Sequence, residues 1–333
     1  MRLFGKERIK EAEKQESLES NLPFLIDEQL KLDLVIRNVL ITIGHDISSL
    51  SREKLVEYFV EHQKGIVKNI ERLVRLIPSE IPPEYLAEIE AALLSGRQVV
   101  LLGPHWSVAD TASFIKVVQK LRQRKTLANG GINPVVLGPA STKFFDTTRP
   151  DTMFGSTLMD SLDQLGLELF QIAQVQDNTI TGMERAKVNL KAWKQIISGM
   201  KKGKILGIFP EGTRAQGPGA GRAPIEVGNA LLKILRDDAL IVPIATFGSH
   251  RFLGKGMNVP NFLHLFTQKI VMGKPMTKLQ MMELYETMGD SILLNNQAPI
   301  HPIEIPIMQI LASADKQYWG KFTDVILDEK DRF

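Results

Sequence analysis

Short apolar runs alternate with amphipathic stretches after Gly96, and this pattern constrains the fold more than any other feature of the chain. The apolar runs lie at residues 99–102, 135–137, 169–175, 205–209, 240–247 and 269–272. Stretches with helical periodicity lie between or after them, at residues 107–122, 181–201, 225–236 and 276–294. This alternation predicts an α/β fold with a mostly parallel sheet flanked by helices. Ligands of such sheets collect at the carboxyl ends of the strands, so residues directly after each run are candidates for a site.

The chain before Gly96 has a different, helical pattern. Apolar residues recur there at three- to four-residue spacing from about Leu22 onward, as in the segment from Leu30 to Ile43. Pro83 begins a further short helix that Gly96 closes. We therefore expect an N-terminal helical region at residues 1–96 and an α/β domain at residues 97–333.

Composition and charge exclude several classes of protein. With 44% apolar and 24% charged residues, the chain has the composition of an ordinary globular protein. It contains no cysteine, which excludes a disulfide framework, a thiol nucleophile and a cysteine-ligated zinc site. Its 41 basic and 38 acidic residues leave a net charge of +3, far from the one-sided basic balance typical of proteins that bind nucleic acid.

No targeting or membrane-spanning segment is predicted. The first twenty residues are charged and lack the apolar core of a secretory signal, so we expect the protein in the cytoplasm or in an organelle interior. The longest charge-free stretch, residues 126–142, contains glycines and prolines that do not suit a spanning helix. A lipid substrate would therefore have to be reached from the membrane surface.

The first candidate motif follows the apolar run at residues 99–102. It contains His105 and, five residues later, Asp110 at the start of a predicted helix. A carboxylate in that place can hold the imidazole in one tautomer and keep it basic enough to accept a proton from a hydroxyl. A structural interpretation stays open beside it, because Ser107 and Asp110 also have the spacing of a helix capping box.

The second candidate motif follows the run at residues 205–209. It consists of Phe209-Pro210-Glu211-Gly212-Thr213-Arg214, in which proline ends the strand, Gly212 permits a tight turn and Arg214 can bind an anion with two donors. This segment could hold a phosphate. Taken alone, it could equally be an ordinary turn with a solvated arginine.

Together, the two motifs and the later segment Ile241-Val242-Pro243-Ile244 resemble three sequence blocks of the glycerolipid acyltransferase family. That family includes the glycerol-3-phosphate and 1-acylglycerol-3-phosphate O-acyltransferases. The order of the blocks and their places after predicted strands are similar to those of the family. The resemblance covers residues 99–275, about half of the chain.

The resemblance implies O-acyl transfer to a hydroxyl of a phosphorylated glycerol acceptor in phospholipid biosynthesis. It implies that His105 is the general base, Asp110 its orienting partner, and Glu211, Gly212, Thr213 and Arg214 the acceptor site. The donor would be acyl-CoA or acyl-carrier protein as a co-substrate, with neither a metal nor another cofactor. The acceptor would be glycerol-3-phosphate or a lysophospholipid at a membrane surface, and backbone amides near Ser107 are candidates to stabilise the oxyanion.

Two positions depart from the family's pattern. The family has a further block between the two motifs, its second block in chain order, which usually ends a strand in an Asp-Arg pair, whereas residues 174–178 here read Gln-Val-Gln-Asp-Asn. A lysine two residues before a glycine, downstream of the block that matches Phe209–Arg214, is replaced by Glu226 ahead of Gly228. Arg185 and Arg222 are candidates to supply the lost positive charge, although an arginine is more often an ordinary residue of the protein surface.

Alternatives from other classes therefore stay open. The altered second block is compatible with another lysophospholipid or a different alcohol as the acceptor. A catalytically silent module that binds lipid or acyl-carrier protein is the alternative outside enzymes.

Three further segments carry structural expectations. We expect a flexible flap at residues 217–221, solvated basic residues from Lys116 to Lys125, and core packing by the methionines at 272–288.

Overall fold

The computed structural model of the protein describes residues 67–68, 71, 74–141, 162–173, 181–215, 217–253, 267–288 and 299–329. The chain divides into two compact units, residues 1–65 and 66–333, and all described residues belong to the second. The helices expected before residue 66 lie outside the described residues. The expected boundary at Gly96 falls inside the second unit, whose core includes the preceding helix α4 (Pro83–Leu94).

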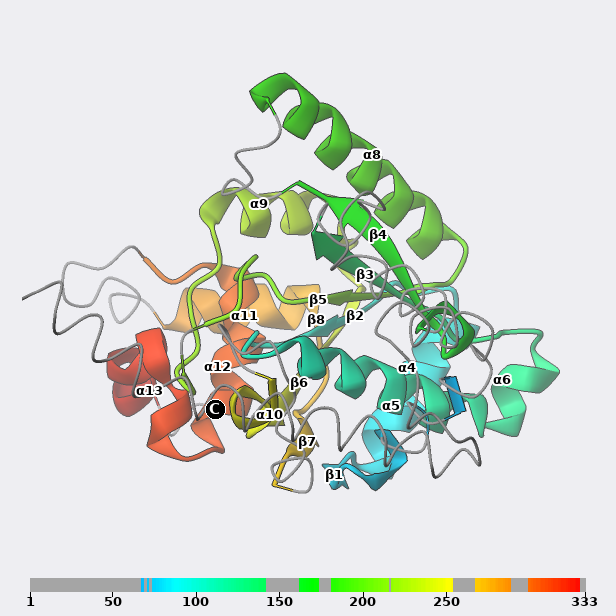
Figure 1. The fold of residues 1–333 in the computed structure, drawn as a ribbon, viewed down its shortest axis with the longest axis horizontal. Coiled ribbons are helices and arrows are strands. Elements are labelled where there is room, and N and C mark those ends of the chain that lie inside the picture. The colour runs from blue at the N-terminus through cyan, green and yellow to red at the C-terminus, as the bar shows by residue number, and fades with distance from the viewer. Residues whose placement is uncertain are drawn as a thin grey trace, which may run out of the picture. The chain divides into compact units, whose positions relative to one another are not determined.

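The described residues form an α/β fold, as the sequence predicts, around a mostly parallel sheet of eight strands (Figure 1). The strand order is β1-β7-β6-β2-β5-β3-β4, and β8 pairs with β6 at one side of this path. The strands are β1 (Ser79–Glu80), β2 (Val99–Leu102), β3 (Val136–Ser141), β4 (Leu167–Ile172), β5 (Ile205–Ile208), β6 (Leu240–Phe247), β7 (Lys269–Met272) and β8 (Met276–Thr277).

Five neighbouring strands, β6, β2, β5, β3 and β4, run parallel. In the central pairing, Val100 of β2 lies opposite Leu206 of β5. β7 and β8 run antiparallel to β6, while β1 is parallel to β7. The parallel strands are rich in apolar residues because helices cover both faces, which is the condition under which parallel sheets occur.

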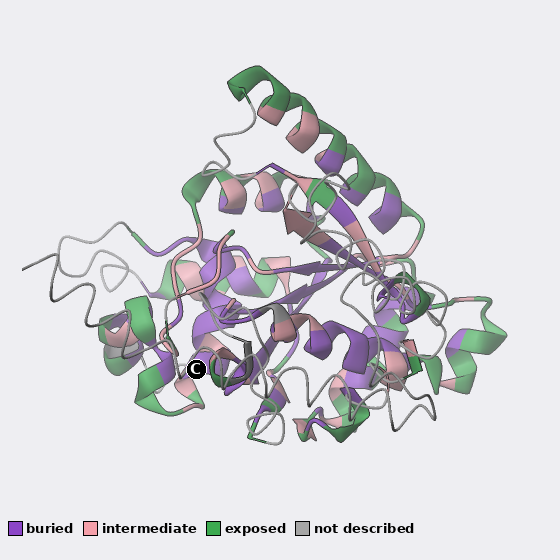
Figure 2. Ribbon diagram, viewed as in Figure 1, coloured by how far each residue is buried: buried purple, intermediate pink, exposed green. Residues whose placement is uncertain are grey.

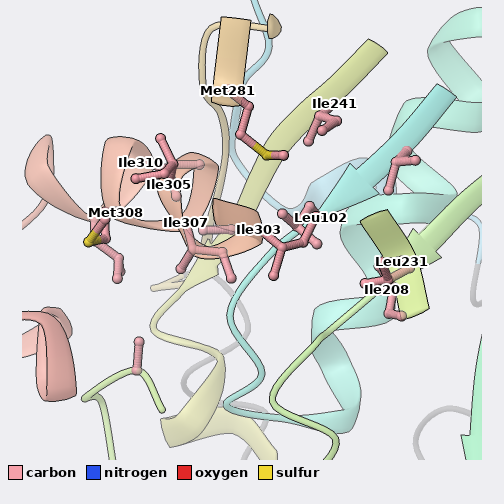
Figure 3. Close-up of a cluster of buried hydrophobic side chains, with 14 of the residues drawn as sticks. Leu102, Ile208, Leu231, Ile241, Met281, Ile303, Ile305, Ile307, Met308 and Ile310 are labelled. Carbon is pink, nitrogen blue, oxygen red and sulfur yellow. The ribbon is translucent and has the colours of Figure 1, made fainter. Parts of the chain in front are cut away.

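Two hydrophobic clusters occupy the two faces of the sheet. In β2, Val99 and Leu101 belong to one cluster and Val100 and Leu102 to the other, because successive side chains of a strand point to opposite faces. α4 and α5 (Thr111–Arg122) cover the first face, and α8 (Gly182–Lys201), α9 (Ile225–Ile234), α11 (Lys278–Thr287) and α12 (Ile305–Ala312) pack on the second. Figure 3 shows part of the second cluster, where Leu102, Ile208 and Ile241 meet side chains of α9, α11 and α12. Buried residues accordingly line the sheet and the inner sides of these helices (Figure 2).

Several shorter helices complete the described structure. These are the α-helices α6 (Lys125–Asn129), α10 (Ser249–Leu253) and α13 (Thr323–Glu329), and the 3₁₀ segments η1 (Val108–Asp110), η5 (Pro302–Glu304), η6 (Lys316–Tyr318) and η7 (Gly320–Phe322). No helix in the described parts of the chain is long and apolar enough to cross a bilayer.

Two glycines allow the close approaches on which the site depends. A Cβ atom on Gly103, directly after β2, would lie 1.9 Å from the carbonyl oxygen of Ile244 in β6. A Cβ atom on Gly207 of β5 would lie 2.9 Å from the ring of Phe114, a buried residue of α5. At Gly103 only glycine therefore fits without movement of the β6 backbone, and at Gly207 a Cβ atom would displace the side chains of Val136 and Phe114.

Lys116 departs from the expectation of a solvated basic stretch. It is buried in α5, and its ammonium group donates to the carbonyl oxygens of Val74, Arg75 and Ile77 at 3.0, 2.8 and 3.2 Å. Burial lowers the pKa of this ammonium group. Lys116 thus supplies donors to backbone carbonyls at the end of the preceding helical segment, which periodicity alone could not indicate.

We expect Gly103→Ala to destabilise the protein by about 1–3 kcal/mol, because the added methyl group must displace the backbone of β6. Gly182→Ala is the matched control, since a Cβ atom there meets nothing within 4 Å. That substitution should be neutral or stabilise by up to about 1 kcal/mol. Urea denaturation of both variants measures the difference, and equal stabilities would contradict the close approach at Gly103.

Candidate active site

The two candidate motifs lie side by side, after two neighbouring strands from which the chain continues to opposite faces of the sheet. β2 and β5 are neighbouring parallel strands, and both motifs follow their carboxyl ends. After β2 the chain enters α5 on one face of the sheet, and after β5 it enters α9 on the opposite face. Loops that leave adjacent strands toward opposite faces open a crevice between them, which is the usual ligand position in open α/β sheets.

His105 and Asp110 lie in contact at this place. Nδ1 of His105 is 3.2 Å from Oδ2 of Asp110. The imidazole side chain is 20% exposed, whereas the Asp110 carboxylate is buried. A carboxylate accepts hydrogen bonds, so Nδ1 carries the proton in the neutral ring and Nε2 keeps its lone pair.

Asp110 is held by three further donors. Its Oδ2 accepts from the backbone N–H groups of Trp106 and Ser107, both at 2.7 Å, and its Oδ1 accepts from the hydroxyl of Ser249. Ser107 in turn accepts at Oγ from the backbone N–H of Ala109 at 3.0 Å. One half of the expected capping box is therefore present, the bond from the Ser107 N–H to Asp110, while Ser107 Oγ binds Ala109 and α5 begins only at Thr111. The same carboxylate also contacts His105.

This arrangement corrects one expectation about the mechanism. The backbone amides near Ser107 were candidates to stabilise an oxyanion, but those of Trp106 and Ser107 donate to Asp110, and that of Ala109 donates to Ser107. They turn inward because a buried carboxylate must be solvated by nearby donors. We therefore assign none of these three amides to an oxyanion.

Aromatic rings fix the plane of the imidazole. The His105 ring stacks on Phe209, with centroids 4.6 Å apart and an interplanar angle of 7°, and Phe209 stacks in turn on Phe114 at 4.8 Å. Phe209 is the residue directly after β5, so the second motif supplies one wall of the histidine site. A ring held by stacking and by Asp110 has little rotational freedom, which is the preorganisation that proton transfer requires.

Glu211 joins the two motifs through backbone hydrogen bonds. Its Oε1 accepts from the N–H of His105 and its Oε2 from the N–H of Gly221, each at 2.9 Å. The carbonyl oxygen of His105 also accepts from the N–H of Ala215 at 2.8 Å. Glu211, which the family resemblance assigns to the acceptor site, is thus a buried residue whose carboxylate connects the loops after β2 and β5 by hydrogen bonds.

Burial raises the pKa of the Glu211 carboxyl to about 7. The donors from His105 and Gly221 act in the opposite direction, and the nearby negative charges of Asp110 and Glu304 raise the pKa further. Loss of solvation outweighs the two hydrogen bonds because the carboxylate is almost entirely removed from water.

The remaining residues of the second motif form the turn that follows Glu211. Gly212 has a positive φ of 69° and is exposed, and its N–H donates to the carbonyl oxygen of Phe209 at 3.2 Å. Thr213 and Arg214 are half-buried. The positive φ explains the glycine, and the turn carries Arg214 past the carboxyl end of β5.

The two arginines considered as replacements for the missing charge lie in different settings. Arg222 binds Glu304 through two contacts, Nε to Oε1 at 2.8 Å and an amino group to Oε2 at 2.9 Å, and also donates to the Pro299 carbonyl. It therefore fastens the segment after the second motif to the C-terminal part of the chain. Arg185 lies half-buried in the first turn of α8.

Residues 217–221, the segment expected to be a flexible flap, are held by backbone hydrogen bonds. The N–H of Ala220 donates to the carbonyl oxygen of Tyr318, and the N–H of Lys321 donates to that of Ala220, at 3.1 and 3.0 Å. Ala220 is buried, and Gly221 is bound by Glu211. These bonds to the 3₁₀ segments η6 and η7 hold the segment against the C-terminal part of the chain.

Ser249 and an aromatic group near His105 were not identified from the sequence. Trp106, Phe247 and Tyr318 pack together with centroid distances of 4.8 to 5.5 Å. Ser249 follows β6 by two residues, so the rule that sites lie after strands could have found it. Tyr318 comes from a C-terminal segment without a recognisable motif, and no signal in the sequence indicated it.

The other described histidines have structural settings. His250 packs edge to face on Tyr318, and His301 accepts from the N–H of Ile303 in the cap of η5. Of the five methionines expected in the core, Met272, Met276, Met281 and Met288 are buried, and Met282 is half-buried against the core. In the described ranges, His, Asp and Glu residues do not form a group of three or more that could hold a metal ion.

Comparison of the chain with models of known protein families gives no match, and comparison with curated proteins gives none either.

We expect Glu211 to make stability depend on pH. Between its ordinary value of 4.5 and about 7, the folded state binds more protons than the unfolded state, so the free energy of unfolding falls as the pH rises. This contribution amounts to about 3 kcal/mol at most. Glu211→Gln removes the titration, so its stability relative to wild type should increase from pH 5 to pH 8 by that order.

Chemical denaturation at several pH values measures this difference. Glu226→Gln, at an exposed position of α9, controls for the change of charge itself. A stability difference between Glu211→Gln and wild type that stays constant over the range would contradict the raised pKa.

Proposed function

We propose that this protein is an O-acyltransferase that transfers an acyl group from a thioester to a hydroxyl of a phosphorylated glycerol acceptor. The contact of His105 with the buried Asp110, beside the loop that carries Arg214, is the observation that carries the proposal. A histidine whose Nδ1 lies against a buried carboxylate, at the carboxyl ends of two adjacent parallel strands, supports the role of general base that we propose for it. The resemblance of the motifs to the glycerolipid acyltransferases supports the type of reaction.

In the proposed reaction, Nε2 of His105 accepts the proton of the acceptor hydroxyl while the hydroxyl oxygen attacks the carbonyl carbon of the thioester. A carbon–oxygen bond forms and gives a tetrahedral intermediate. The carbon–sulfur bond then breaks, and the leaving thiolate takes the proton from the imidazolium. Asp110 remains a carboxylate throughout and stabilises the imidazolium from the Nδ1 side.

The acceptor would lie against the turn that follows Glu211. The Arg214 guanidinium can bind a phosphate with two parallel hydrogen bonds, which favours a phosphorylated acceptor over a neutral alcohol. Glu211 would act indirectly, by holding the backbone of His105 next to this turn. The donor would be acyl-CoA or acyl-carrier protein, and the acceptor glycerol-3-phosphate or a lysophospholipid such as 1-acylglycerol-3-phosphate.

Thiol release from acyl-CoA and acyl-carrier donors, with and without each acceptor, tests the proposal. We expect acceptor-dependent release by the wild type and a decrease of about a hundred- to ten-thousand-fold for His105→Ala. His301→Ala is the control, because the His301 ring lies in the cap of η5, where Nδ1 accepts from the N–H of Ile303 at 3.2 Å. Folding of each variant is checked by its urea midpoint.

The same assay separates the acceptors. Arg214→Ala should raise KM for a phosphorylated acceptor far more than for a neutral alcohol, and an equal loss with both would remove the phosphate assignment. Turnover with a neutral alcohol alone would indicate a different acceptor class. Binding of acyl-carrier protein or lipid without thiol release from any donor would contradict the enzyme and favour a binding module.

A further inference from the structure

The helix α8 presents an apolar stripe to solvent. Met183, Leu190 and Ile197 are 72%, 57% and 37% exposed, and they follow one another at intervals of seven residues. Seven residues make nearly two helical turns, so the three side chains lie within about 40° of one another along about 21 Å of helix. The opposite side of α8, with Ala192 and Ile196, is buried in the core, and exposed residues run along the outer side in Figure 2. We call Met183, Leu190 and Ile197 the outer stripe.

The outer stripe is distinct from other exposed apolar residues. In the described part of the chain, the other large apolar side chains at the surface occur one to a helix, at Leu76, Leu94, Ile225, Leu279 and Leu327. Single exposed apolar residues are normal on protein surfaces and require no explanation. Three on the same side of one helix, two turns apart, form a line of apolar side chains exposed to water.

Positive charge accompanies the outer stripe. Exposed lysines lie beside it on α8, at positions 187, 191, 194 and 201. The helix has five basic residues and one acidic residue, a net charge of +4, whereas the whole chain has a net charge of +3. The one acidic residue, Glu184, is tied to the helix start, where its carboxylate accepts from the N–H and hydroxyl of Thr181. The four exposed lysines therefore give the outer side of this helix a positive charge.

An apolar stripe bordered by lysines matches the chemistry of an anionic bilayer surface. Apolar side chains enter the boundary between head groups and acyl chains, while lysines at the sides meet lipid phosphates. We propose that the outer face of α8 docks on a bilayer that contains anionic phospholipids. The long lysine side chains can extend toward the head groups while their stems cover the stripe.

The direction of α8 is compatible with delivery of a lipid to the candidate site. α8 begins at Gly182, after the carboxyl end of β4, and its other end leads back to the start of β5. Met183 therefore lies toward the edge of the sheet that also carries His105, because β2 and β4 run parallel. This role rests on the proposed function, whereas the docking itself needs no turnover.

Co-sedimentation of the full chain with vesicles tests the docking. One set of vesicles contains phosphatidylcholine and phosphatidylglycerol in equal parts, and the other contains phosphatidylcholine alone. We expect binding to the first set, little binding to the second, and a loss of about tenfold or more when Met183, Leu190 and Ile197 are all replaced by serine. Replacement of Lys187, Lys191 and Lys194 by glutamine should weaken the binding and reduce its dependence on salt.

The matched control replaces three exposed apolar residues of other helices, Leu94, Leu279 and Leu327, by serine. This variant should bind vesicles as the wild type does. Equal binding by the outer-stripe variant and the wild type would overturn the proposal, as would an absence of wild-type binding to anionic vesicles. A wild-type dimer that the outer-stripe variant abolishes, with vesicle binding unchanged, would show a surface for a second copy of this chain.

Three further outcomes separate this proposal from others. If the glutamine variant loses binding to an acidic carrier protein while neither variant changes vesicle binding, the partner is a protein and the bilayer proposal fails. Thiol release with a water-soluble donor and glycerol-3-phosphate should be the same for the outer-stripe variant and the wild type. Vesicle binding without thiol release from any donor would contradict the proposed enzyme and leave the docking surface intact.

Discussion

The buried carboxylate of Asp110 is the group on which the candidate site depends. Removal of a carboxylate from water is costly unless donors replace the water, and here four groups do so: the amides of Trp106 and Ser107, the hydroxyl of Ser249 and the His105 ring. The same four contacts fix the chain between β2 and α5 and connect it to α10. The course of this loop and the orientation of the histidine are therefore two consequences of one buried charge.

The second constraint is the adjacency of β2 and β5. Gly103 and Gly207 let these strands approach β6 and α5 closely, and the loops that follow then lie side by side. Glu211 bonds to the backbone of His105, and Phe209 stacks on its ring, so the second motif supports the first directly. A raised carboxyl pKa at Glu211 is the energetic consequence of this buried support.

The sequence predicts the sheet well where strands are uninterrupted apolar runs, as in β2, β6 and β7, whose bounds agree with the structure. It does not predict β1, because a strand of two residues is too short to show an alternating pattern. It does not predict α12 either, because that helix is apolar on nearly all sides and shows no helical spacing of apolar residues. The contact of His105 with Asp110 follows from local spacing, so the motif indicated it. The role of Ser249 arises from a contact across 139 residues, and that of Arg222 from an ion pair with a distant glutamate, so only the fold reveals them.

The tautomer of His105 tests the central claim most directly, because the proposed base needs its lone pair on Nε2. The measurement is a ¹⁵N–¹H correlation spectrum of histidine-labelled protein at a pH where the ring is neutral, with the His105 signals assigned by their absence in His105→Gln. The structure predicts a protonated Nδ1 and an unprotonated Nε2, and Asp110→Asn should disturb this preference. A neutral ring with its proton on Nε2 in the wild type would contradict the account.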